Sequence, residues 1–360
     1  MMFDVIVVGA GPAGSAAAKK CVERGLKTLL LEKRKLPRDK TCSGWIMRPW
    51  AQSIIRDEFG TVPEELLVAP RYLSGIMLHM PGVKSQRVDV DFPVTWRRDL
   101  DYWLTQRARD KGVDICEETK VLGVDESAEG CRVQVTRAGE LEELGAKFVI
   151  GADGANSKVR KSILPGLALR LSFAYRECYR GSLDLVKDHC HWFHPAYRLR
   201  PRFDVQHKAD CFLIEGSGVK ELENQKRRIL SDYGFDPQQK PIWKDGCFLP
   251  VCHEQLLSGS YSPAKGNILL VGDAAGFLTP PLADGIGVAL KSGIIAVSSI
   301  SKAIRAGEDV AGIYLQDLAP ILSMLRYVDS LTEQFEEKAV RGPQWAMEAL
   351  REAWEGLLLW

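Results

Sequence analysis

Neither sign of charge dominates the sequence. Its 360 residues carry 48 lysines and arginines against 47 aspartates and glutamates, which gives a formal net charge of +1. Such a balance provides no long-range attraction to nucleic acid or to an anionic membrane surface. Internal repeats and low-complexity tracts are also missing, which excludes solenoids and compositionally biased tails. We therefore predict a globular protein without a nucleic-acid partner.

Long uncharged apolar runs are missing as well. None reaches the roughly 18 residues of a membrane span, so we predict no spanning helix. The first residues, MMFDVIVVGAGPAG, run straight into an expected strand, without the pattern of a signal peptide. The nine cysteines are scattered and odd in number, unlike those of a disulfide-stapled secreted domain. We expect a cytoplasmic protein, and peripheral membrane contact stays open.

What the sequence does contain begins with a glycine turn between a strand and a helix. Residues 3–8 form a short apolar run, typical of a strand buried on both faces. GAGPAG follows at 9–14, and a second strand at 27–31 ends before an acid. Such glycines permit a tight turn, close approach of a pyrophosphate, and helix packing on the strand. The predicted dinucleotide-binding residues are Gly9, Gly11, Pro12, Ala13, Gly14, Glu32 and Lys33.

A second glycine-rich stretch distinguishes between cofactors. GDAAG at 272–276 follows an expected strand at 267–271 and precedes a long helix that starts near Gly285. An acid at a strand end can hold a ribityl hydroxyl, and a helix N-terminus can stabilise negative charge on a reduced flavin. A nicotinamide dehydrogenase has no use for this second site, so FAD is favoured. The predicted contacts are Gly272, Asp273, Gly285 and Ile286.

The remaining segments predict two lobes and a helical end. Residues 97–111 have apolar side chains at helical spacing. From about 165 to 260, alternating strands and a polar helix indicate a separate antiparallel sheet. We expect an α/β fold with a discontinuous Rossmann-like FAD-binding domain and an inserted mixed or antiparallel substrate lobe. The predicted boundaries are 1–164 and 265–330 for the FAD-binding domain, 165–264 for the lobe, and 331–360 for a C-terminal helical segment.

Several motifs together resemble known flavoproteins. Two stretches resemble the glutathione-reductase-type FAD fold in its aromatic-hydroxylase-like branch. They are GAGPAG, together with Glu32 after the next strand, and GDAAGFLTPPLADGIGVALKSG. GADGANSKVRK (151–161) resembles the middle motif of that branch, which implies that Asp153 and Gly154 contact the flavin dinucleotide. TWRRDLDYWL resembles its R-x-x-[FL]-D-x-x-L pattern, which implies that Arg97 lies near the cofactor.

Within that branch, PRDKTCSGWIMRP and the GDAAG stretch most resemble the geranylgeranyl reductase family. Members use reduced FAD to saturate C=C bonds of isoprenoid chains. Two departures are visible. The aromatic Tyr-x-Trp-x-Phe-Pro signature of the family is absent, and the aromatic stretch HWFHPAY (191–197) does not match it. Ala283 stands where a glycine is usual, beside a retained Asp284.

Cys42, in TCSGWIMRP, is the candidate catalytic and flavin-contacting residue. The resemblance implies that it lies near the flavin and the substrate pocket, with Gly44 allowing close approach to the ring. A thiol there could position substrate, tune the flavin or donate a proton, and the alternative is a small apolar filler. A nearby basic cluster could stabilise a thiolate. That cluster comprises Arg34, Lys35, Arg38 and Lys40.

A group of histidines raises the question of a metal. On a strand, His189 and His191 would share a face, and Cys190 would point away. Because no carboxylate or CxxC pair is in register with them, we predict no metal site.

The leading hypothesis is a FAD-dependent oxidoreductase that reduces C=C bonds of an isoprenoid or other hydrophobic substrate with hydride from reduced flavin. An aromatic monooxygenase shares the GADG and GDAA motifs, and a non-catalytic flavoprotein scaffold or redox partner is a third hypothesis. The sequence lacks a second complete nucleotide-binding domain. The expected electron donor is therefore transiently bound NAD(P)H or a donor protein such as reduced ferredoxin, and the oligomeric state stays open.

Overall fold

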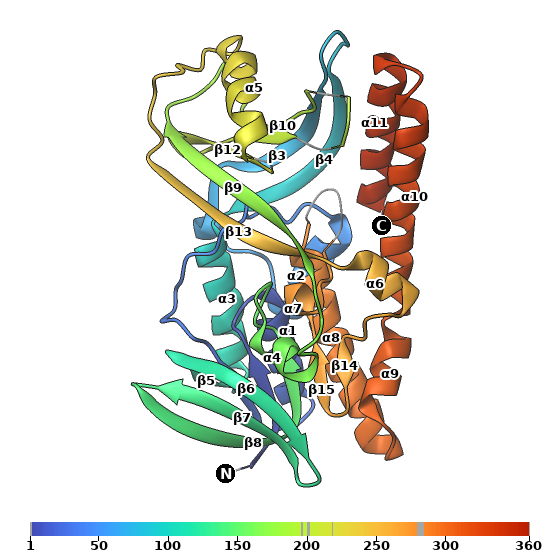
Figure 1. Ribbon diagram of the computed structural model, residues 1–360. Helices are drawn as coiled ribbons and strands as arrows, with labels where there is room; N and C mark the ends of the chain where they lie inside the picture. Colours follow the sequence, from blue (N-terminus) through green and yellow to red (C-terminus); the bar gives the residue numbers. More distant parts are fainter. Residues whose placement is uncertain (1, 196, 200–201, 218, 279–283, 360) are drawn as a thin grey trace.

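The computed structural model describes residues 2–195, 197–199, 202–217, 219–278 and 284–359. Two sheets lie at opposite ends of the molecule, and a pair of long helices runs along one side (Figure 1). Ala196, within HWFHPAY, and Ala283 lie outside the described residues.

The first sheet is built on the N-terminal strand-helix-strand unit. β1 (Met2–Val8) pairs in parallel with β2 (Thr28–Leu31) and β8 (Glu140–Gly151), and β15 (Ile268–Leu270) extends the sheet beyond β8. Val5, Ile6 and Val7 are fully buried, as expected for a strand covered on both faces. The other strands of this sheet are β5 (Asp114–Cys116), β6 (Thr119–Ser127), β7 (Gly130–Arg137) and β14 (Ala264–Lys265).

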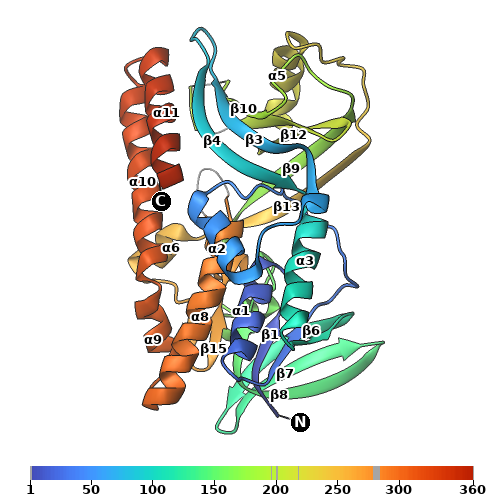
Figure 2. The ribbon, with the colours of Figure 1, turned by 180° about the vertical axis from the view of Figure 1, so that it is seen from behind.

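Helices α1 (Pro12–Glu23), α3 (Arg97–Asp110) and α8 (Ile286–Ala306) lie side by side against this sheet (Figure 2). At Gly293, a Cβ would lie 2.4 Å from the Ala13 carbonyl oxygen, so α1 and α8 touch backbone to backbone. By length and composition alone, α8 could also cross a membrane, because an 18-residue stretch of it is apolar on average and has at most two charged residues. In the fold, however, 67% of that stretch is buried, which is the environment of a core helix.

The second sheet has the strand order β13-β9-β12-β11-β10-β3-β4. Its pairs are antiparallel except β10 with β3, so the expectation of a mixed or antiparallel lobe is confirmed. α5 (Val219–Ser231) covers one face of it (Figure 1). The strands are β3 (Leu67–His79), β4 (Gln86–Thr95), β9 (Arg170–Arg180), β10 (His189–Phe193), β11 (Phe203–Lys208), β12 (Cys211–Ser217) and β13 (Trp243–Val251).

Strands β3 and β4 belong to this second sheet although they lie within the predicted range 1–164. The chain therefore enters the lobe before residue 165 and returns to the first sheet through α3. Local periodicity gives no sign of this, because the partner β10 lies more than a hundred residues downstream in the sequence. The domain boundaries themselves stay a prediction.

The C-terminal helices connect the two ends of the molecule. α10 (Ala319–Ala339) packs against α11 (Pro343–Leu359), and α11 contacts β3 and β4. Trp354 is buried edge-on against Trp192 of β10, with ring centroids 4.6 Å apart. The remaining helices are α2 (Pro49–Phe59), η1 (Glu64–Leu66), α4 (Lys158–Ile163), α6 (His253–Ser258), α7 (Gly272–Ala275) and α9 (Val310–Asp317).

Candidate cofactor and substrate site

A cavity of about 670 Å³ runs between the two sheets. One end, here called the dinucleotide end, is lined by the glycine turn after β1 and by the acid after β2. The other, the lobe end, is lined by Trp45, Trp192, Arg202, Asp204 and Glu215. The carboxyl ends of parallel strands in an open α/β sheet are where such folds bind nucleotides.

Most of the sequence-predicted residues lie on this cavity. Gly14, Gly44 and Gly272 do not line it. The predicted residues that do are Gly9, Gly11, Pro12, Ala13, Glu32, Lys33, Cys42, Arg97, Asp153, Gly154, Asp273, Gly285 and Ile286.

The glycine turn after β1 leaves room for a pyrophosphate. A Cβ on Gly9 would lie 2.5 Å from the Ala152 carbonyl oxygen, and one on Gly14 would lie 1.8 Å from the Gly9 carbonyl oxygen. These two glycines are therefore required by backbone packing. Gly11 differs, because a Cβ there would meet nothing closer than an Arg38 nitrogen at 3.7 Å. Its open face and the N-terminus of α1 beside it fit an anionic ligand.

Glu32 is held in place at the dinucleotide end. Its carboxylate accepts hydrogen bonds from the backbone N–H groups of Ala10 and Arg34 and from the Arg38 side chain, each at 3.1 Å. Arg38 also donates to Asp101 at 3.2 Å and to the Ala10 carbonyl oxygen at 3.2 Å. The sequence assigned Arg38 to a cluster around Cys42, but its guanidinium is committed to Glu32 and the glycine turn.

Asp153 has a structural task in addition to lining the cavity. Its carboxylate accepts from the Ser157 hydroxyl at 2.5 Å and from the Lys158 backbone N–H at 2.6 Å, at the start of α4. Burial raises the pKa of Asp153, although these hydrogen bonds oppose the rise. The carboxylate is thus turned into the protein, and the adjacent Gly154, with φ of +78°, presents backbone to the cavity.

Arg160 joins the middle motif to the second glycine stretch, a role that the sequence did not reveal. Its guanidinium donates to the Ala155 carbonyl oxygen at 2.5 Å and to the Ala274 carbonyl oxygen at 2.7 Å. It is buried, so both loops share one cation. The only sequence signal was its place within GADGANSKVRK.

The start of α8 forms the cavity wall near Cys42. Gly285 precedes the helix and Ile286 is its first residue. Arg48 forms an ion pair with Asp284 at 2.7 Å, and Arg48 is 1% exposed. This buried pair attaches the TCSGWIMRP loop to the helix start.

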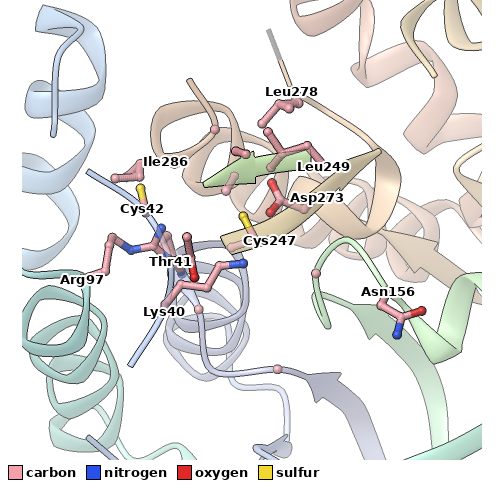
Figure 3. A pocket seen from close by; sticks show the side chains of 18 of the residues that line it. Lys40, Thr41, Cys42, Arg97, Asn156, Cys247, Leu249, Asp273, Leu278 and Ile286 are labelled. Atoms are coloured by element: carbon pink, nitrogen blue, oxygen red, sulfur yellow. The ribbon is translucent and has the colours of Figure 1, made fainter. Parts of the chain in front are cut away.

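Cys42 lies beside Arg97 on the cavity wall (Figure 3). Arg97 donates to Asp101 at 2.7 and 3.0 Å, and its side chain lies next to that of Cys42 (Figure 3). Burial alone would lower the pKa of Arg97, but the charge of Asp101 raises it. Arg176 donates to the Cys42 carbonyl oxygen at 2.6 Å. Cations distant in sequence therefore lie beside Cys42, and the contribution of the local basic cluster stays a prediction.

Gly44 serves the packing of the same loop. Its φ is +79°, and a Cβ would lie 2.0 Å from the Thr95 carbonyl oxygen at the end of β4. Lys208 donates to that oxygen at 2.7 Å and to the Ser43 carbonyl oxygen at 2.6 Å. Burial lowers the pKa of Lys208 to about 7. Gly44 therefore allows close approach to β4, whereas the resemblance implied close approach to a flavin ring.

The lobe end combines aromatic rings with buried charges that the sequence did not identify. Trp45 and Trp192 have ring centroids 6.4 Å apart, and the Trp45 indole donates to Gln206. The Arg202 guanidinium lies over the Trp192 ring, 3.7 Å from its centroid. Asp204 and Glu215 complete this end. A wall of this kind offers apolar contact area with a few fixed polar groups.

The histidines form a hydrogen-bonded strand face. His79 Nε2 and His191 Nδ1 are 3.0 Å apart, and His191 Nε2 is 3.0 Å from the Val186 carbonyl oxygen. Burial lowers the pKa of His79 to about 3 and that of His191 to about 4. Among the described residues, no group of three or more histidine, cysteine or acidic side chains has the geometry to hold a metal ion.

Comparison with known proteins gives three kinds of likeness. A family model described as FAD dependent oxidoreductase matches residues 4–155. The digeranylgeranylglycerophospholipid reductase of Methanococcus vannielii is 28% identical over 84% of this chain and 78% of its own length. The geranylgeranyl diphosphate reductase of Rhodobacter capsulatus is 29% identical over 86% of this chain and 77% of its own. A solved structure from Thermoplasma acidophilum, described as geranylgeranyl bacteriochlorophyll reductase-like, has a TM-score of 0.75, 19% identity, and coverage of 99% and 98%.

Proposed function

Because this chain belongs to the geranylgeranyl reductase family of FAD-dependent oxidoreductases, we propose that it reduces C=C bonds of an isoprenoid chain on a lipid or another hydrophobic carrier. One observation supports this most strongly. A single cavity joins a dinucleotide end to an aromatic lobe end, with Cys42 on its wall. Such a cavity can bring a cofactor and an apolar chain together.

We propose that the dinucleotide end holds FAD. The open face of Gly11 and the N-terminus of α1 would receive the pyrophosphate, and Glu32 would accept from ribose hydroxyls. Asp273 and the start of α8 at Gly285 would face the flavin portion. Bound FAD supplies the two-electron hydride chemistry that no side chain provides. The chain's part is to position the cofactor and the substrate.

The lobe end would bind the reacting part of an isoprenoid. Trp45, Trp192 and Met47 offer apolar surface, and burying such area is the main source of affinity for an apolar chain. The Trp45 indole is already hydrogen-bonded to Gln206, so its ring is oriented before the substrate arrives. We further propose NAD(P)H or reduced ferredoxin as electron donor and a cytoplasmic location with access to lipid.

The function is tested with purified, FAD-loaded protein and a digeranylgeranyl glycerophospholipid under anaerobic conditions. After chemical reduction of the flavin, we expect the lipid to gain two hydrogens per reduced bond, measured by mass spectrometry. Reoxidation of the flavin should accompany this gain. An unchanged lipid would refute the proposal, and a hydroxylated product formed with oxygen would replace it by a monooxygenase.

Cys42 is proposed as an active-site residue, and its substitution is a separate test. Cys42→Ala should keep FAD bound, because the loop is held by Arg48, Lys208 and Arg176 through other atoms. Loss of the thiol contact to Arg97 should lower single-turnover reduction about tenfold or more. Cys42→Ser is the matched control for size and hydrogen bonding. Full turnover in Cys42→Ala would assign this residue to packing alone.

A further inference from the structure

Two carboxyl groups face each other at the lobe end of the cavity. Asp204 on β11 and Glu215 on β12 are direct partners in the antiparallel register. Directly opposite residues have Cβ atoms about 4.5–5.5 Å apart. Asp204 is 4% and Glu215 7% exposed, and both line the cavity. Two acids in this arrangement are rare in a protein interior, and nothing in the cofactor-binding motifs requires them.

The hydrogen bonds of the two groups differ. Glu215 accepts from the Ser43 hydroxyl at 2.5 Å, and its other oxygen lies 4.0 Å from Arg176. Asp204 accepts from Arg202 at 3.3 Å through Oδ1. Asp204 Oδ2 and Glu215 Oε1 are both buried without a hydrogen-bond partner among the residues that the structure describes. An unpartnered buried oxygen costs far more free energy as part of a charged carboxylate than as part of a neutral carboxyl group, so burial favours protonation here.

The surrounding charges also favour one shared proton. The cations nearby are Arg202 beside Asp204, and Arg176 and Lys208 beside Glu215. Burial, followed by the charge of Glu215, raises the pKa of Asp204 well above its usual range. Burial also raises the pKa of Glu215, opposed by Arg176, Ser43 and Lys208. The other titratable groups close to the two acids and their cations include Asp245, Cys190, Cys42, Cys178, Tyr175 and His194. Repulsion between two facing carboxylates favours one proton on the pair, and the larger rise in pKa places it on Asp204.

We propose that the Asp204 carboxyl group is the proton donor for the reduction, and that Glu215 is its positioning partner. The inference rests on the proposed function. Reduced FAD, which Glu32, Asp273 and the start of α8 would hold, would supply a hydride with its two electrons to one carbon of the C=C bond. The Asp204 O–H bond breaks, and its proton bonds to the other carbon through the former π pair. The resulting carboxylate regains a proton from solvent, so the substrate gains two hydrogens in all.

The first test needs neither flavin nor substrate. Infrared difference spectra of the apoprotein, recorded during a pH titration, should show the C=O stretch of a protonated carboxyl group near neutral pH. The band should shift in D₂O and disappear in Asp204→Asn. Asp210→Asn, an exposed residue at the turn of the same hairpin, is the matched control and should leave the band unchanged. Absence of the band in the wild-type protein would overturn the proposal, even if Asp204→Asn failed to fold.

The second test uses the reduced holoenzyme and the same digeranylgeranyl lipid. Asp204→Asn should bind FAD normally and lower single-turnover reduction about 10²–10⁴-fold, the usual contribution of a general acid. Glu215→Gln should instead move the pH at which the rate falls. In the wild type, the rate should fall as pH rises through the titration seen by infrared. Wild-type rates in both variants would overturn the proposal.

The two tests separate the inference from the proposed function. If the wild-type holoenzyme leaves the lipid unchanged while the infrared band is present, the isoprenoid assignment fails and the protonated acid stands as an observation. If the lipid is reduced at the normal rate by Asp204→Asn, the function stands and the proton donor is another group. Comparison with Cys42→Ser then shows whether the thiol supplies the proton.

Discussion

Replacing Gly44 with alanine tests how tightly the Cys42 loop is held against the second sheet. The new Cβ would lie 2.0 Å from the Thr95 carbonyl oxygen, which must retreat by about 1 Å to reach the 3.0 Å limit of real contacts. The positive φ of +79° adds about 1–2 kcal/mol for any residue with a Cβ. Overpacking of this kind costs about 1–3 kcal/mol more. We expect Gly44→Ala to lose about 2–5 kcal/mol of unfolding free energy.

Gly25→Ala is the matched control, because Gly25 has a φ of +75° and no atom within 4 Å of the added Cβ. Gly25→Ala should lose only the part of the unfolding free energy that comes from the positive φ. Urea unfolding measures both variants, and bound flavin is measured by absorbance. Because the clash displaces the oxygen that holds Lys208, Gly44→Ala should also lose turnover, and Gly25→Ala should not. Equal stability in the two variants would refute the packing role of Gly44.

Two further predictions concern acid stability and cofactor affinity. Burial lowers the pKa of His79 to about 3, of His191 to about 4 and of His194 to about 3, whereas unfolded histidine titrates near 6.5. Below pH 6.5 the unfolded chain therefore binds more protons than the folded protein, so the free energy of unfolding should fall from pH 6.5 toward pH 4. The urea midpoint measures this fall, and it should depend less on pH in His79→Gln. Arg160→Met should weaken FAD binding about tenfold or more, because two buried carbonyl oxygens lose a charged donor. Its exposed neighbour Lys161→Met should bind FAD normally, and equal affinities in a flavin titration would contradict the bridging role.

The dinucleotide end was predictable because its determinants are local. Gly9, Gly11 and Gly14 follow one strand within six residues, and the acid that faces them closes the next strand. Chain connectivity alone brings them together, since a right-handed crossover makes the two strands parallel neighbours. Spacing and residue type were therefore enough to predict that these residues lie together, although the use of Asp153 at the start of α4 was not visible.

The lobe end was not predictable, because its determinants meet through strand register. Asp204 and Glu215 face each other because of how β11 and β12 pair, and Trp45 meets Trp192 through the folding of separate segments. A shift of one residue in either strand would turn a side chain to the opposite face. Local sequence patterns do not indicate which residues of the two strands will pair. The cations around Cys42 were missed for the same reason, since Arg176 and Lys208 come from the second sheet.

The loop from Thr41 to Arg48 also has a consequence for the order of folding. Ser43 reaches Glu215, Thr41 reaches Asp245, and Arg48 reaches Asp284. Contacts between such distant parts of a chain close large loops. They form late in folding, because the chain loses conformational entropy on closing the loop before the contacts stabilise it. During synthesis, this early loop must wait for most of the chain to be made. The protein should therefore acquire its flavin after translation is nearly complete, so the reduction site is assembled as one of the last steps of folding.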